Sequence, residues 1–133
     1  MTQNEKDLVL KDLCARLPHG VNMAAGYGKG VLTSIRINDS DERLGINIDP
    51  TLIRMFSVND VKPYLFPLSS MTTEQKNEFN TQSLKLQLQV IDDEIMYEKA
   101  TEFEVDFYNK HHLDWRGLIP MGLAIDATGK NIY

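Results

Sequence analysis

The stretch from Val21 to Val58, VNMAAGYGKGVLTSIRINDSDERLGINIDPTLIRMFSV, decides the fold. Short segments rich in β-branched and apolar residues alternate with segments rich in glycine, asparagine, aspartate and proline. Residues of the first kind favour strands, and residues of the second kind favour turns. Four strands this close together leave no room for helical crossovers between them. We therefore expect an antiparallel meander that can curl towards a small barrel.

The segment GYGKG, Gly26–Gly30, invites comparison with nucleotide-binding loops. A Walker loop would need a glycine where Met23 stands and a hydroxyl residue where Gly30 stands. A dinucleotide-binding loop would need a helix after its third glycine, where a strand is predicted. We interpret the segment as a hairpin loop in which glycine supplies positive φ angles.

Helices are predicted at residues 4–16, 73–80 and 102–111. Each prediction rests on a capping box, in which a threonine and a Glu or Gln three residues later satisfy free backbone amides. The first helix also carries apolar residues at helical spacing and ends before Pro18. The three capping pairs are Thr2 with Glu5, Thr72 with Gln75, and Thr101 with Glu104.

Two further segments are predicted to adjoin the sheet. VKPYLFPLSSM, Val61–Met71, contains two prolines that forbid a regular helix or a central strand, so we expect an extended segment across the sheet or along its edge. In SLKLQLQVI, Ser83–Ile91, apolar and polar residues alternate, which predicts a strand with one buried face. The sequence therefore predicts an α+β fold, with a small, mostly antiparallel sheet and about three helices packed against it.

Length and composition are those of one globular domain, which we expect to span residues 1–133. The apolar fraction of 42% and the charged fraction of 25% are ordinary for such domains. The net charge is −5, and the whole excess lies in residues 71–133, with 6 basic and 11 acidic residues. General nucleic-acid binding is therefore disfavoured, although a local basic face formed only by folding is compatible with the sequence.

Cys14 is the single cysteine, which excludes an intrachain disulfide and a multi-cysteine zinc module. It lies on the apolar side of the first predicted helix, where we expect it to be buried. The polar, acidic start of the chain is unlike a secretory signal, and no apolar run approaches the roughly 20 residues needed to cross a bilayer. The sequence predicts a soluble, cytoplasmic protein with no membrane association.

KHHLDWRGLIPMGLAID, Lys110–Asp126, gathers the residues most suggestive of chemistry. The rings of His111 and His112 would point about 100° apart on a helix, so they cannot share one ion. His112 and Asp114 are spaced to meet in a turn, but catalytic zinc usually takes three protein ligands. The remaining histidine, His19, is far away in the sequence, so a metal site requires the fold to bring it near.

The alternative to a metal or catalytic site is that this stretch has a structural role and holds the end of a helix against the core. Asp114 would accept hydrogen bonds from backbone amides or pair with Arg116. Trp115 would pack into the core, and Gly117 would allow the chain to reverse. We favour this alternative and predict no catalytic residue, no metal and no cofactor.

The chain resembles a family of small uncharacterised proteins found in prophages, phages and mobile elements of gut anaerobic bacteria. The resemblance rests on DLVLKDLCARLPHGV at 7–21, KPYLFPLSSMT at 62–72 and HHLDWRGLIPMGLA at 111–124. It implies a phage or prophage context and no particular activity. Phe66 departs from the family pattern, because the resemblance implies a basic residue after the tyrosine-leucine pair.

Two functions are compatible with these features. The first, which we favour, is a non-enzymatic interaction protein that binds a host or phage protein through an aromatic-rich surface. Its expected binding residues are Tyr64, Phe66, His112, Asp114, Trp115 and Arg116. The second is a small-ligand or metal-dependent site, which requires one pocket lined by His19, His112, Asp114 and Arg116.

Overall fold

The computed structural model describes residues 1–26, 28–39, 41–49, 52–88 and 94–133. Its helices are α1 (Gln3–Arg16), α2 (Thr73–Leu88) and α3 (Glu94–Lys110), with 3₁₀ turns η1 (Leu17–His19), η2 (Val58–Asp60) and η3 (Leu68–Ser70). Its strands are β1 (Asn22–Ala25), β2 (Gly28–Ile37), β3 (Glu42–Asp49), β4 (Leu52–Phe56), β5 (Val61–Leu65) and β6 (Ile125–Asp126).

The strands form one six-stranded sheet in the order β4-β3-β2-β1-β5-β6. All neighbours are antiparallel except β5 and β6, which are parallel. The predicted α+β fold and the antiparallel meander are therefore confirmed. The expectation of a barrel is wrong, because the described strands leave β4 and β6 as separate edges of an open sheet.

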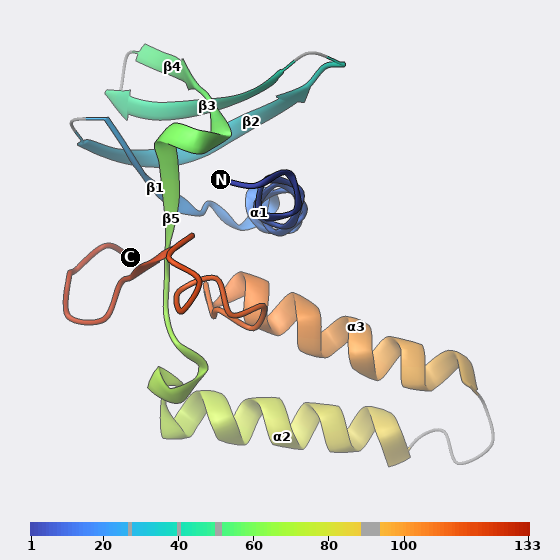
Figure 1. Ribbon diagram of the computed structural model, residues 1–133. Helices are drawn as coiled ribbons and strands as arrows, with labels where there is room; N and C mark the ends of the chain where they lie inside the picture. Colours follow the sequence, from blue (N-terminus) through green and yellow to red (C-terminus); the bar gives the residue numbers. More distant parts are fainter. Residues whose placement is uncertain (27, 40, 50–51, 89–93) are drawn as a thin grey trace.

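Helix α1 covers one face of the meander (Figure 1). The predicted capping box is present, since Thr2 Oγ1 accepts from the Glu5 amide at 3.1 Å and Glu5 Oε1 accepts from the Thr2 amide at 2.9 Å. Cys14 is exposed, so its expected burial is wrong. The buried face of α1 is turned away from Cys14 and includes two charged residues, Asp12 and Arg16.

The core lies between α1 and the inner face of the sheet. Apolar side chains of α1 contact those of β1, β2 and β3, and the chain after α3 closes the same cluster from below. Burial of apolar surface of this kind is the main favourable contribution to folding. The fully buried members include Val9, Leu13, Val21, Met23, Leu44, Ile46, Val58, Leu65 and Leu118.

The predicted strand at Ser83–Ile91 is wrong as far as Leu88, because these residues continue α2; Gln89–Ile91 lie outside the described residues. The helix begins at the predicted capping box of Thr72 and Gln75. It then continues past the expected end because Phe79, Ser83 and Leu86 lie on one face at helical spacing.

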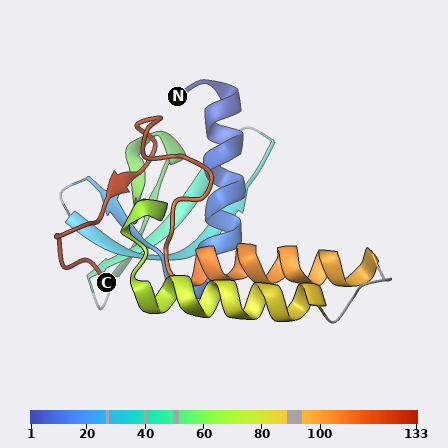
Figure 2. The ribbon, with the colours of Figure 1, turned by 90° about the horizontal axis from the view of Figure 1, so that it is seen from below.

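Helix α3 supplies the surface that this face of α2 contacts. Phe79 packs against Phe103, Phe107 and Tyr108, with ring centroids 6.3, 5.4 and 5.2 Å away. Figures 1 and 2 show α2 and α3 side by side, reaching beyond the sheet. The capping box predicted at Thr101 is wrong, since Thr101 lies inside α3 and Glu104 accepts a hydrogen bond from Ser83 Oγ at 2.6 Å.

Strand β5 shows that Pro63 is compatible with an interior strand, whereas Pro67 lies outside the strand, at the start of η3. The extended conformation is confirmed for Val61–Leu65 and is wrong for Leu68–Ser70, which form the 3₁₀ turn η3. The position across the sheet or along its edge is also wrong, because β5 lies between β1 and β6. Strand β6 spans only two residues, beside Tyr64 and Leu65. Pro63 therefore lies where β6 offers no acceptor, and its missing N–H leaves no gap in that ladder.

Gly30 is the glycine whose replacement should disturb the sheet most. A Cβ atom at this position would overlap the backbone carbonyl of Asn47 on β3. Gly30→Ala should lower the free energy of unfolding by about 1–3 kcal/mol, as overpacking does elsewhere. The measurement is urea denaturation followed by circular dichroism.

Gly28→Ala is the matched control, because the added Cβ would lie 3.5 Å from Ile48 Cγ2, an ordinary contact. Its stability should stay within about 0.5 kcal/mol of the wild type. Equal losses in the two variants would contradict the account of this strand pair.

Candidate functional site

The chain after α3 pairs with the chain after β5. His112 has a φ of +59°, which ends the helix and turns the chain towards β5. The Phe66 amide donates to the His112 carbonyl and the Asp114 amide donates to the Phe66 carbonyl, both at 2.8 Å. The two most specific sequence motifs, KPYLFPLSSMT and HHLDWRGLIPMGLA, therefore contact each other.

Asp114 is the centre of the turn that follows. Its carboxylate is buried, and its two oxygens accept hydrogen bonds from the amides of Leu118 at 2.7 Å and Ile119 at 2.9 Å. Gly117 has a φ of +77°, which allows the reversal between them. The expectation that Asp114 caps backbone amides is confirmed, and both of its oxygens are used in doing so.

Trp115 lies at the margin of the core, half-buried, so its expected insertion into the core is wrong. The indole Nε1 donates to Oδ1 of the buried Asn109 at 3.0 Å. The guanidinium of Arg116 lies over the indole, 4.0 Å from the ring centroid, in a cation–π contact. The indole therefore stabilises the end of α3 by a hydrogen bond to Asn109 at its edge and a contact with Arg116 on its face.

A buried charged group joins this turn to α1. Arg16 Nε donates to Asp12 Oδ2 at 2.7 Å, and both side chains are fully buried. Asp12 Oδ1 accepts from Arg116 Nε at 3.2 Å, and Arg16 Nη2 donates to the Leu113 carbonyl at 2.7 Å. These contacts span about a hundred residues of sequence. The sequence signal was the i, i+4 spacing of Asp12 and Arg16, which is usually typical of a solvated pair.

The histidines of this region are held by ring contacts. The His112 ring stacks on Tyr133 with centroids 3.7 Å apart, and the His111 ring contacts Phe107 at 4.4 Å. Burial first, and then the charges of Arg16 and His19, lower the pKa of His112 to about 4. His112 is therefore neutral at pH 7.

The residues that a metal or small-ligand site would use make other contacts in the structure. His19 lies near enough to His112 for its charge to lower the pKa of that ring. Both carboxylate oxygens of Asp114 accept from backbone amides, and Arg116 pairs with Asp12. The His112 ring stacks on Tyr133. Over the part of the chain that the structure describes, no three His, Cys, Asp or Glu residues are placed to hold a metal ion. A nearby hollow of about 220 Å³ includes Phe66 and His111 but not His112, Asp114 or Arg116.

Tyr64 and Phe66, the remaining expected binding residues, contact the last residue of the chain. The Tyr133 hydroxyl accepts from the Asn22 amide at 2.9 Å and donates to the Tyr64 carbonyl at 2.7 Å. The Phe66 and Tyr133 rings lie 5.7 Å apart. Burial raises the pKa of Tyr133 to about 12, so its hydroxyl keeps the proton that it donates.

The outer face of the sheet, opposite α1, was not among the sequence predictions (Figure 1). Directly paired residues in an antiparallel ladder share a face. The pairings of Val31 with Asn47, Asn47 with Ile53, and Gly45 with Met55 place three apolar side chains on this face. Val31, Ile53 and Met55 are 39%, 55% and 47% exposed.

Exposed basic side chains flank this apolar strip at both ends. Lys29 and Lys62 pair with the same residue of β1 beyond one end of the strip. Arg36 and Arg43 pair directly with each other at the other end, and Arg43 Nη2 lies 3.3 Å from Asp41 Oδ2. We define the outer-face patch as Lys29, Val31, Arg36, Arg43, Ile53, Met55 and Lys62.

The fold thus brings basic side chains together on one face, which the sequence analysis found to be compatible with the sequence. Alternating residues of four strands build the patch, so no cluster of basic residues is visible in the sequence itself. The signal that could have indicated it is the period-two spacing of Lys29, Val31 and, beyond a bulge, Arg36 along β2.

Comparison of the chain with protein-family models, with curated proteins and with solved structures finds no match. Among the helices that the structure describes, none has the length and apolar character needed to span a bilayer. Function has to be inferred from the geometry of the side chains described above.

Removing the buried carboxylate of Asp12 should be strongly destabilising. Asp12→Ala leaves the fully buried Arg16 guanidinium without its charge partner, and such changes typically cost about 3–5 kcal/mol. Arg43→Ala breaks the exposed pair with Asp41 and should cost at most about 1 kcal/mol. Urea unfolding of both variants measures the difference, and similar costs would contradict the role of the buried charged group.

Stability should fall with acid as His112 becomes protonated. The pKa of His112 is about 4 in the folded protein, against an ordinary value of 6.5. The unfolded chain therefore binds the proton more tightly, and stability present above pH 6.5 is lost as the pH falls towards 4. The measurement is the free energy of unfolding at pH 7.0 and pH 5.5, a range above the ordinary pKa of carboxylates.

His112→Asn is the control for this pH dependence, because asparagine does not titrate and tolerates a positive φ. It should be less stable than the wild type at pH 7, because it loses the ring stack on Tyr133. The decline in stability between pH 7.0 and 5.5 should be smaller in this variant. An unchanged decline would show that other groups cause it.

Proposed function

We propose that the protein is a non-enzymatic interaction protein that binds an acidic partner protein through the outer-face patch. The observation that supports this most strongly is the exposed strip of Val31, Ile53 and Met55, flanked by basic residues on a sheet face that α1 leaves open. Ile53 and Met55 are neighbours on this face of β4, and Asn47 lies between Ile53 and Val31. Exposed apolar side chains with a polar rim are typical of interaction sites.

The charge of the patch supports an acidic partner. Arg36 and Arg43 pair directly, and like charges in that position destabilise a sheet. Asp41 offsets part of the charge of Arg43. A carboxylate from a partner would offset the charge of Arg36 and can accept two parallel hydrogen bonds from its guanidinium. Lys29 and Lys62 extend the positive surface beyond the other end of the strip, which favours a partner with distributed acidic residues.

A protein is a better fit than a nucleic acid. Proteins that bind single strands stack bases on aromatic side chains, and the strip of Val31, Ile53 and Met55 is aliphatic or thioether. The chain as a whole carries a net charge of −5, which repels a polyanion. An apolar centre with a charged rim is the usual anatomy of a protein–protein interface.

This proposal places the partner away from the binding residues expected from the sequence. Asp114, Trp115 and Arg116 all use their polar groups in internal contacts. The resemblance to phage and prophage proteins favours a host or phage protein as the partner. The exposed thiol of Cys14 is typical of a reducing compartment, which supports a cytoplasmic location.

Affinity purification with variants in the patch tests the proposal. The wild type, Ile53→Asp and Leu84→Asp would be used to retain proteins from nuclease-treated lysate of a gut anaerobic bacterium, the host that the resemblance implies. Leu84 is exposed on α2, so Leu84→Asp is a matched control away from the patch. A partner should be retained by the wild type and by Leu84→Asp, and lost with Ile53→Asp.

The affinity of that partner, once purified, measures the contribution of the patch. Ile53→Asp should raise the dissociation constant at least about tenfold, as expected for a buried interface anchor. Arg36→Glu should slow association, and the wild-type rate should fall with salt. Retention by all three proteins, or a retained species that is nucleic acid, would contradict the proposal.

A further inference from the structure

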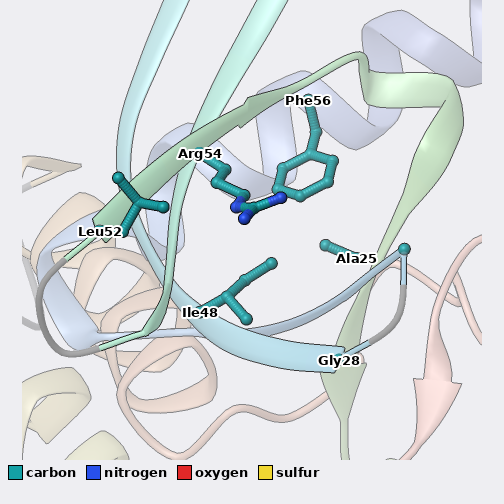
Figure 3. Close-up of a pocket in the computed structure, with 7 residues that line it drawn as sticks. Ala25, Gly28, Ile48, Leu52, Arg54 and Phe56 are labelled. Carbon is teal, nitrogen blue, oxygen red and sulfur yellow. The ribbon is translucent and has the colours of Figure 1, made fainter.

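A cavity of about 270 Å³ opens between the β1–β2 hairpin and strand β4, on the side of β4 opposite the outer-face patch. The curl of the open sheet brings these two segments near each other (Figure 3). The labelled lining residues are Ala25, Gly28, Ile48, Leu52, Arg54 and Phe56.

The cavity exists because the hairpin carries glycine where it approaches β3 and β4. A Cβ on Gly28 would contact Ile48 Cγ2 at 3.5 Å, and a Cβ on Gly26 would contact Phe56 Cε1 at 3.7 Å. Larger side chains at either position would occupy the space. Gly26 and Gly28 of the GYGKG segment, which does not match a phosphate-binding loop, thus line one side of the cavity.

Arg54 is the one charged residue among the described residues that line the cavity, and its side chain is exposed to solvent. It pairs with the buried Ile46, so its side chain leaves β4 on the inner side of the sheet. Figure 3 shows the guanidinium among Ile48, Leu52 and Phe56. Within the described residues, the ion pairs of the chain involve other arginines, and no carboxylate pairs with Arg54.

We propose that this cavity binds an apolar group carrying a single carboxylate. The apolar part would contact Ile48, Leu52 and Phe56, and the carboxylate would accept parallel hydrogen bonds from the Arg54 guanidinium. Pockets of this kind combine apolar walls with a few polar groups that fix orientation. The site is independent of the outer-face patch, which lies on the opposite face of the sheet.

Two sources supply this chemistry, namely a free small acid and the C-terminal residue of a peptide. The free edge of β4 lies beside the cavity, so an extended peptide could pair with the edge while its last side chain and carboxylate enter. The other role open to Arg54 is protective, because an inward-pointing charge on an edge strand prevents pairing between sheets.

Binding is tested by titrating methyl-labelled and arginine-labelled protein with 4-phenylbutyrate and following the NMR signals of Arg54, Ile48 and Leu52. We expect a dissociation constant below about 1 mM for a ligand of this size. The amide, 4-phenylbutyramide, and acetate should each bind at least about tenfold more weakly, because they lack the charge or the apolar body. A hexapeptide ending in leucine is compared with its C-terminal amide in the same way.

Three variants define the site. Arg54→Gln should weaken the acid at least about tenfold, and Gly28→Val should abolish binding by filling the cavity. Lys85→Gln, at an exposed position of α2, should leave the affinity unchanged. Circular dichroism confirms that each variant is folded.

Carboxylate-dependent binding that requires Arg54 supports the proposal for either source, and the tighter of the two ligands identifies the source. Equal binding of acid and amide would overturn it, as would an unchanged affinity in Arg54→Gln. Absence of binding by both acid and peptide would also overturn it. If no ligand binds and Arg54→Gln self-associates, the charge of Arg54 serves to prevent pairing between the β4 edges of two molecules.

Discussion

The contact between α1 and the chain after α3, made through buried charges, is the constraint on which the rest of the structure depends. Asp12 accepts from Arg16 and Arg116, and Arg16 donates to the Leu113 carbonyl. A fully buried carboxylate requires such partners, because removing a charge from water is costly. The contact fixes α1 on the turn around Asp114, which in turn orders Leu118 against the core. The first and last parts of the chain are therefore joined by specific polar contacts.

Local signals in the sequence predicted the features that local contacts decide. The capping boxes at Thr2 and Thr72 start α1 and α2 where expected, because each involves side chains and amides within one helical turn. The hairpin at Gly26 and the turn around Asp114 were also predicted from short spacings. Residues close together in the sequence decide these elements, so they could be predicted without knowing their tertiary contacts.

Contacts between distant segments decided the features that were predicted wrongly. The leucines of Ser83–Leu88 alternate as in a strand, but Phe79 and Ser83 meet Phe103 and Glu104 of α3, which keeps the segment helical. The sequence could not indicate the burial of Asp12 and Arg16, since their partners lie about a hundred residues away. The outer-face patch and the Arg54 cavity likewise depend on strand register and on the curl of the sheet.

The distribution of charge supports a division of roles between the two parts of the fold. The acidic excess lies in residues 71–133, which include α2, α3 and β6, whereas the outer-face patch carries basic side chains. An acidic partner would be repelled by the helices and attracted to the sheet. The stretch Lys110–Asp126 contributes Asp114, Trp115 and Arg116, whose polar groups make contacts within the fold.

Amide hydrogen exchange of Leu118 and Ile119 tests most directly whether the turn around Asp114 is as stable as the core. Their amides donate to Asp114, so in this account they open only when the whole protein unfolds. Their free energy of exchange should equal that of Leu44 and Ile46 in the buried strand β3. Exchange at a clearly lower free energy, with β3 still protected, would show that the turn opens locally and would contradict the account.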